Sequence, residues 1–124
     1  MKVLVVEDNP SNMKLVARLL TGAGHEVLKA EEAEGGIRLA QDESPDLILL
    51  DMQLPGMDGL SAVARLREDE RTKDIKVVAL TAFAMDGDRE RFLQAGCDEY
   101  MSKPIGYKEF LKMIDSFKAG SKDE

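Results

Sequence analysis

Three carboxylates directly follow apolar segments, an arrangement that could gather their charges in one place. Glu7 and Asp8 come after the apolar run at 3–6, and Asp51 comes after a second run at 47–50. If these runs are neighbouring parallel strands, their carboxyl ends meet at the same edge of a sheet. Unpaired carboxylates would repel one another in a partly buried cleft, so a cation is expected there. Oxygen ligands with an incomplete protein shell suit Mg²⁺.

Two further polar residues follow apolar segments in the same way. Thr81 comes directly after the run at 77–80, and Lys103 comes shortly after the segment at 100–101. Together the residues supply what phosphoryl transfer to a carboxylate needs. Asp51 would be the nucleophile, a metal ion would neutralise the transferred oxygens, and Lys103 and Thr81 would each hold one of them.

The elements that must position these residues alternate along the chain. The runs at 3–6, 47–50 and 77–80 are short, continuous and apolar, which is typical of strands covered on both faces. Apolar residues at helical spacing predict one-sided helices between and after them. Asn9 and Pro10 are residues typical of a helix start. The helical positions are Met13, Val16, Ala17 and Leu20; Leu60, Val63 and Leu66; and Tyr107, Phe110, Leu111, Ile114 and Phe117.

Weaker patterns complete the alternation. Strands are predicted at 26–30 and 100–101, with helices through Ile37 and Leu39 and over 86–95. Five strand–helix pairs predict an α/β fold with right-handed crossovers and helices on both faces of a five-stranded parallel sheet. We expect the flavodoxin-like strand order 2-1-3-4-5. Its switch point, where ligands bind, lies between the first and third strands.

Size and charge limit the possible functions. The chain has 124 residues, which fits one domain, predicted at 1–119 with a polar tail at 120–124. The formal net charge of −7 disfavours nucleic acid and anionic membrane surfaces as partners. The single Cys97 cannot form an internal disulfide, and no apolar run approaches the length that spans a bilayer. A cytoplasmic location is therefore expected.

Four dispersed motifs carry a resemblance to a known family. V-V-E-D-N, L-L-D-M-Q-L-P-G-M-D-G, A-L-T-A and S-K-P occur in the order and at the spacing of the receiver domain of two-component response regulators, the CheY-like superfamily. The resemblance covers residues 2–118. The stretches E-D-N-P-S-N-M-K-L and L-T-A-F-A-M-D-G-D-R-E-R resemble DivK-type single-domain regulators and the receivers of hybrid kinases most.

The resemblance implies a phosphoacceptor function and a metal site. Asp51 would accept a phosphoryl group from a sensor histidine kinase or a histidine phosphotransfer protein. Asp8, Asp51 and the main-chain carbonyl of Gln53 would ligate Mg²⁺, or Mn²⁺ in its place, with Glu7 acting through coordinated water. Such a protein is a signalling phosphoacceptor with only self-catalysed phosphorylation and dephosphorylation, and not an enzyme in the usual sense.

The resemblance also implies a switch. The Thr81 hydroxyl and the backbone N–H of Ala82 would bind phosphate oxygens, and Tyr100 would then move from exposed to buried. The surface of the fourth helix, fifth strand and fifth helix would repack for a downstream protein target. A cis Lys103–Pro104 peptide would aim the lysine inward. The protein would be a monomer or a weak phosphorylation-dependent dimer.

Four residues receive secondary interpretations. Gln53 and Phe83 would flank the route of the hydrolytic water and set the lifetime of the aspartyl phosphate, in a direction that the sequence leaves open. His25 and Cys97 have no partners in the motifs, so a turn and a packing role are predicted for them.

Other functions stay open at this point. The chain could be a receiver cut from a longer regulator or a hybrid histidine kinase. A phosphohydrolase of the haloacid dehalogenase type also uses an aspartate nucleophile, but Gln53 stands where its second aspartate is needed. A nucleotide or flavin binder would need a phosphate-binding glycine motif after the first strand, and none is present. A degenerate receiver would lack an acceptor-site residue, and none is missing.

Overall fold

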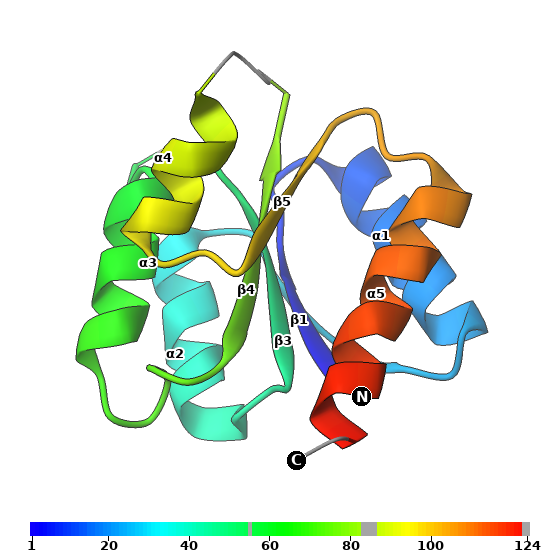
Figure 1. Cartoon of the computed structure of the whole chain (residues 1–124), viewed down its shortest axis with the longest axis horizontal. Coiled ribbons are helices and arrows are strands. Elements are labelled where there is room, and N and C mark those ends of the chain that lie inside the picture. Colours follow the sequence, from blue (N-terminus) through cyan, green and yellow to red (C-terminus); the bar gives the residue numbers. More distant parts are fainter. Residues whose placement is uncertain (55, 83–86, 123–124) are drawn as a thin grey trace.

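Five parallel strands form a single sheet, in the predicted order β2-β1-β3-β4-β5. The computed structural model describes residues 1–54, 56–82 and 87–122 (Figure 1). The strands are β1 (Lys2–Val6), β2 (Glu26–Ala30), β3 (Leu47–Asp51), β4 (Lys76–Thr81) and β5 (Glu99–Ser102).

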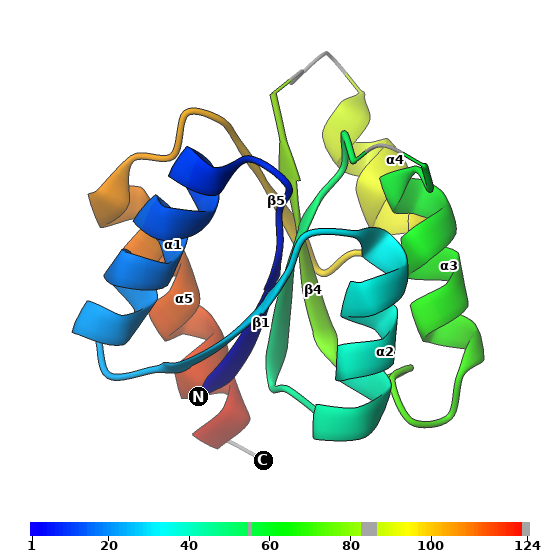
Figure 2. The same ribbon diagram turned by 180° about the vertical axis from the view of Figure 1, so that it is seen from behind.

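Helices cover both faces of the sheet, which confirms the predicted fold class. They are α1 (Pro10–Gly22), α2 (Ala33–Glu43), α3 (Gly59–Glu68), α4 (Asp88–Ala95) and α5 (Tyr107–Lys122). Figures 1 and 2 show α1 and α5 on one face and α2, α3 and α4 on the other. Within the described ranges, no helix is both long enough and apolar enough to cross a membrane.

The apolar strands supply two separate hydrophobic cores. Successive side chains of a strand point to opposite faces of the sheet. Leu4 and Ile48 therefore pack in the core with α2, α3 and α4, whereas Val5 and Leu49 pack in the core with α1 and α5. All four are almost fully buried. This double burial explains why the strands are continuous apolar runs instead of alternating polar and apolar residues.

Local signals fix the start of α1. The Asn9 side chain accepts a hydrogen bond of 3.1 Å from the backbone N–H of Asn12, and Pro10 opens α1 as predicted. At the other end of the chain, α5 extends to Lys122 and so includes part of the segment predicted as a polar tail. The predicted start of the fourth helix at residue 86 lies outside the described residues, and α4 begins at Asp88.

One residue of the predicted apolar faces is exposed. Tyr107 is 57% exposed, although its spacing places it with Phe110 and Ile114, which are fully buried. Tyr107 is the first residue of α5.

Gly59, the first residue of α3, sits against the segment that follows β3. A Cβ atom added at Gly59 would lie 2.5 Å from the Met52 Sδ atom and 2.8 Å from the Met52 Cα atom. We expect Gly59→Ala to lower the free energy of unfolding by about 1–3 kcal/mol, because overpacking moves backbone. Urea denaturation measures this change.

The matched control for that substitution is Gly35→Ala. Gly35 lies in α2, and no atom lies within 4 Å of a Cβ added there. Removing a glycine from a helix interior should raise the free energy of unfolding by roughly 0.5–1 kcal/mol. Equal effects of the two substitutions would show that the contact with Met52 is not the cause.

Arg67 of α3 joins three segments at the opposite end of the sheet from the acidic residues. Its guanidinium donates to the carbonyls of Gly96, Lys73 and Ile75 and to the Asp98 carboxylate, at distances of 2.6–3.0 Å. A guanidinium has five N–H donors in a rigid plane, and all of them can be used in this arrangement. The end of α4 and the start of β4 are thereby held to α3.

His25 and Cys97 occupy the structural positions predicted for them. Cys97 is 5% exposed within the core beneath α2, α3 and α4, and burial raises the pKa of its thiol to about 11. His25 precedes β2, and its Nδ1 atom accepts a 3.0 Å hydrogen bond from the N-terminal ammonium of Met1. Burial, and then the positive charges of the N-terminus and Lys118, lower the pKa of His25, while Asp115 opposes them.

The lowered pKa of His25 predicts a pH-dependent stability. Below the ordinary pKa of about 6.5, the unfolded chain takes up a proton that the folded protein binds less readily. Stability present above that pH is therefore lost as pH falls, by up to about 1.4 kcal/mol per pH unit. His25 is the only histidine, so urea unfolding of wild type and His25→Gln between about pH 7.5 and 5.5 isolates its contribution. Parallel pH profiles of the two proteins would contradict this expectation.

Candidate functional site

The three carboxylates predicted to meet do lie together. Strand β1 pairs with β3, so Glu7 and Asp8 beyond the end of β1 lie beside Asp51 at the end of β3. One carboxylate oxygen from each of the three lies within 4.8 Å of the others. Glu7 is 1% exposed and Asp51 is 3% exposed, whereas Asp8 is exposed to solvent. Among the described residues this is the one such group of metal-ligating side chains.

Lys103 places a cation within this acidic cluster. Its ammonium lies 2.9 Å from Glu7 Oε1 and 3.1 Å from Asp51 Oδ2. The Lys103–Pro104 peptide bond is cis, and the Lys103 backbone N–H donates to the Thr81 carbonyl at 2.8 Å. The lysine therefore reaches from the end of β5 across the ends of β4 and β3 to the buried carboxylates.

Burial and charge act against each other at this contact. Burial raises the pKa of Glu7, and the hydrogen bonds from Lys103 and from the backbone N–H of Asn9 oppose that rise without cancelling it. Burial lowers the pKa of Lys103, but its bonds to Glu7 and Asp51 outweigh this, so that its pKa is raised overall. Lys103 accordingly stays charged at neutral pH.

The donor set of the cluster fits a hard divalent cation. Glu7, Asp8 and Asp51 offer only oxygen atoms, and three carboxylates with one ammonium leave a formal charge of −2. Mg²⁺ prefers carboxylate oxygens and keeps several waters, which a half-open site with one exposed carboxylate permits. The geometry therefore supports Mg²⁺ on chemical grounds.

Thr81, Ala82 and Gln53 lie beside the acidic cluster. Thr81 ends β4, next to β3, and is 1% exposed. The Gln53 backbone N–H donates to Asp51 Oδ1 at 2.9 Å. The Gln53 side chain donates from Nε2 to the Thr81 hydroxyl at 2.8 Å and accepts at Oε1 from the Ala82 N–H at 2.9 Å. The sequence indicated Gln53 as a ligand and a residue on the water route, but contained no signal for these contacts.

The aromatic residue predicted to switch is half-buried, not exposed. Tyr100 of β5 packs against Phe92 of α4, with ring centroids 6.0 Å apart and an interplanar angle of 60°. Phe92 is the aromatic residue of α4, and the sequence patterns had given no reason to single it out. Phe83, which was predicted with Gln53 to flank the route of the hydrolytic water, lies outside the described residues.

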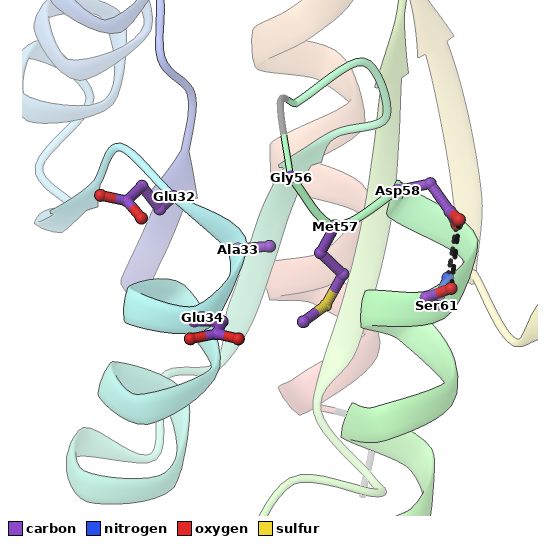
Figure 3. A pocket seen from close by; sticks show the side chains of 7 residues that line it. All are labelled: Glu32, Ala33, Glu34, Gly56, Met57, Asp58 and Ser61. Carbon is purple, nitrogen blue, oxygen red and sulfur yellow. Dashed lines mark hydrogen bonds between the residues drawn. The ribbon is translucent and has the colours of Figure 1, made fainter.

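A separate hollow of about 510 Å³ lies between the first turns of α2 and α3. Figure 3 shows Met57 between the two helices, and Asp58 bonded to Ser61 at the start of α3. The residues that line it are Glu32, Ala33, Glu34, Gly56, Met57, Asp58 and Ser61. None of the cluster carboxylates lines it, so the chemistry of the cluster lies elsewhere.

Known proteins that resemble this chain in sequence and in fold identify its family. The family model of the response regulator receiver domain matches residues 3–115. The polar-differentiation response regulator DivK of Brucella ovis is 44% identical over 115 residues, covering 93% of this chain and 94% of that protein. DivK of Brucella melitensis matches to the same extent.

Solved structures agree. The receiver domain of a sensor histidine kinase from Pseudomonas aeruginosa, with a magnesium ion coordinated in its active site cleft, has a TM-score of 0.85 and 35% identity, covering 94% of this chain and 95% of that one. A CheY-like receiver domain protein from Methanospirillum hungatei has a TM-score of 0.88 and 25% identity, covering 99% and 98%. The resemblance carried by the four sequence motifs is thus confirmed: this chain belongs to the response regulator receiver domain family of two-component signalling proteins.

Proposed function

We propose that the protein is a phosphorylatable signalling switch whose phosphoacceptor is Asp51. The observation that carries this proposal is the setting of the Asp51 carboxylate. It is 3% exposed, and its two oxygens are held separately, Oδ1 by the Gln53 N–H and Oδ2 by the Lys103 ammonium. A carboxylate oriented in this way beside two further acids is suited to attack an incoming phosphoryl group. Family membership favours this function over the phosphohydrolase alternative.

The phosphoryl donor is proposed to be a phosphohistidine on a sensor histidine kinase or a histidine phosphotransfer protein. An Asp51 carboxylate oxygen attacks the phosphorus in line, a P–O bond forms and the P–N bond to the imidazole breaks. The electron pair of that bond returns to the imidazole nitrogen. Lys103, the Thr81 hydroxyl and the Ala82 N–H hold the transferred oxygens, because each is a donor at the same edge of the sheet.

Asp8, Asp51 and the Gln53 carbonyl are the residues proposed to hold Mg²⁺, with Glu7 acting through a water molecule. The oxygen-only donor set and the magnesium ion recorded in the related Pseudomonas receiver support this assignment. When bound, Mg²⁺ supplies positive charge that offsets the charge of the phosphoryl oxygens. Replacement by Mn²⁺ stays a prediction.

Phosphorylation is proposed to change the surface formed by α4, β5 and α5. New bonds from the phosphoryl group to Thr81 and Ala82 would stabilise a second position of these two residues. Tyr100 would then move from its half-buried place beside Phe92 to a more buried one. The downstream target is proposed to be a protein, met in the cytoplasm. An effect of Gln53 and Phe83 on phosphate lifetime stays a prediction.

The test is phosphorylation by a small-molecule donor. We expect incubation with acetyl phosphate and Mg²⁺ to give one base-labile phosphoryl adduct, read by intact-protein mass spectrometry, and expect EDTA to abolish it. Beryllofluoride binding with Mg²⁺ is the second measurement, because some receivers accept only from their kinase. A protein that neither forms the adduct nor binds beryllofluoride would contradict the proposed function.

A further inference from the structure

The side-chain amide of Gln53 holds the two groups that the proposed function assigns to phosphoryl binding after β4. Nε2 donates to Thr81 Oγ1 at 2.8 Å, and Oε1 accepts from the Ala82 N–H at 2.9 Å. A primary amide is the side-chain group that offers a neutral donor and a neutral acceptor side by side. Because the backbone N–H of Ala82 can only donate, it fixes which amide atom is the oxygen.

The same residue is tied to the acceptor carboxylate. The Gln53 backbone N–H donates to Asp51 Oδ1 at 2.9 Å, two residues back along the chain. Gln53 therefore connects the end of β3 to the segment after β4 through its main chain at one end and its side chain at the other. The two strands also pair directly, and the Met52 N–H donates to the Leu80 carbonyl at 2.8 Å, but the Gln53 amide is the group that bonds the Ala82 N–H.

Binding by Gln53 and binding by a phosphoryl group exclude each other at Ala82. A backbone N–H has one hydrogen, so it makes one well-aligned bond at a time. Before the Ala82 N–H can donate to a phosphoryl oxygen, its bond to Gln53 Oε1 must break. The two hydrogen bonds of Gln53 contribute free energy to the resting arrangement. The contacts of a phosphoryl group must contribute more than this to move Ala82 away from Gln53.

We infer that the Gln53 amide is a resting-state latch, meaning the pair of hydrogen bonds from Nε2 to the Thr81 hydroxyl oxygen and from the Ala82 N–H to Oε1. The latch keeps the Ala82 N–H occupied and holds the Thr81 hydroxyl oxygen in place until phosphorylation displaces it. This inference rests on the proposed function. Gln53 is therefore a positioning residue for Thr81 and Ala82. The type of side chain at position 53 sets how readily the protein passes to its phosphorylated form.

The variant that tests the latch is Gln53→Met. Methionine has a similar length and flexibility but lacks the amide, and the exposed position of Gln53 should tolerate it. The backbone carbonyl and N–H of residue 53 stay in place. The matched control is Gln41→Met, which removes a 3.0 Å amide bond to Asp69, between the carboxyl ends of α2 and α3 and away from the acidic cluster.

Two measurements are needed. In metal-free, unphosphorylated protein, we expect hydrogen exchange of the Ala82 amide, followed by NMR, to be about fivefold faster in Gln53→Met, the factor that one net hydrogen bond supplies. With Mg²⁺ present, we expect beryllofluoride to bind about fivefold more tightly to the same variant, since no latch has to break. Gln41→Met should match wild type in both.

Unchanged Ala82 exchange in Gln53→Met would overturn the latch, whatever happens in the binding experiment. Faster exchange with weaker beryllofluoride binding would also overturn it, because the amide would then assist the bound group instead of competing with it. If wild type and variant both fail to bind beryllofluoride, the proposed function fails and the competition with it, while exchange still decides whether the resting hydrogen bonds exist.

Discussion

Asp51→Asn is expected to abolish phosphorylation completely while leaving the fold intact. Asparagine has nearly the same shape as aspartate, and its amide oxygen can still accept from the Gln53 N–H, but a neutral amide is not a nucleophile toward phosphorus. No base-labile adduct should appear by intact-protein mass spectrometry after incubation with acetyl phosphate and Mg²⁺. Circular dichroism and urea unfolding should show a folded protein.

The control is Asp42→Asn, which makes the same chemical change at an exposed position of α2 and should phosphorylate like wild type. An adduct of undiminished yield on Asp51→Asn would place the acceptor on another residue and remove the basis of the proposed mechanism.

Lys103→Met is expected to slow phosphorylation by about 10²- to 10³-fold, the usual effect of removing one preorganised charged donor from the transition state. The ammonium lies 3.1 Å from Asp51 Oδ2, where the transferred group would arrive, so its charge needs little reorganisation. Methionine keeps much of the length of lysine without the charge. The rate of adduct formation from acetyl phosphate, at saturating Mg²⁺, measures the effect.

Lys108→Met is the matched control, because Lys108 is exposed on α5 and should leave the rate unchanged. The Lys103 variant also leaves Glu7 and Asp51 buried without their cation, so its fold must be checked by circular dichroism before the rates are compared. A folded Lys103 variant that phosphorylates at the wild-type rate would show that the lysine stabilises the resting cluster only.

The positions of the acidic residues were predictable because they depend on short-range patterns. Glu7 and Asp51 each follow an apolar run, and the order of parallel strands brings the ends of those runs together. Lys103 follows the same logic from β5. The prediction needed only strand assignment and the handedness of the crossovers, which local sequence and general topology determine.

Contacts that join distant segments were not predictable in this way. The bonds from Gln53 to Thr81 and Ala82 depend on the rotamer of an exposed side chain and on the course of a segment 28 residues away. Arg67 has the spacing of an ordinary charged helix residue, and only the assembled fold shows three carbonyls around it. The exposure of Tyr107, the first residue of α5, is likewise a property of the assembled fold that helical periodicity does not contain.

The anchoring of α4 by Arg67 has a mechanical consequence. The Arg67 guanidinium donates two hydrogen bonds to the Gly96 carbonyl, at 3.0 and 2.7 Å. These bonds hold the carboxyl end of α4 to α3. No side chain caps the amino end of α4. Near that amino end, Arg89 forms an ion pair of 3.1 Å with Glu99 of β5. We therefore expect displacements of α4 to be smallest at its carboxyl end, and a displacement of its amino end to pass to β5 through Arg89 and Glu99.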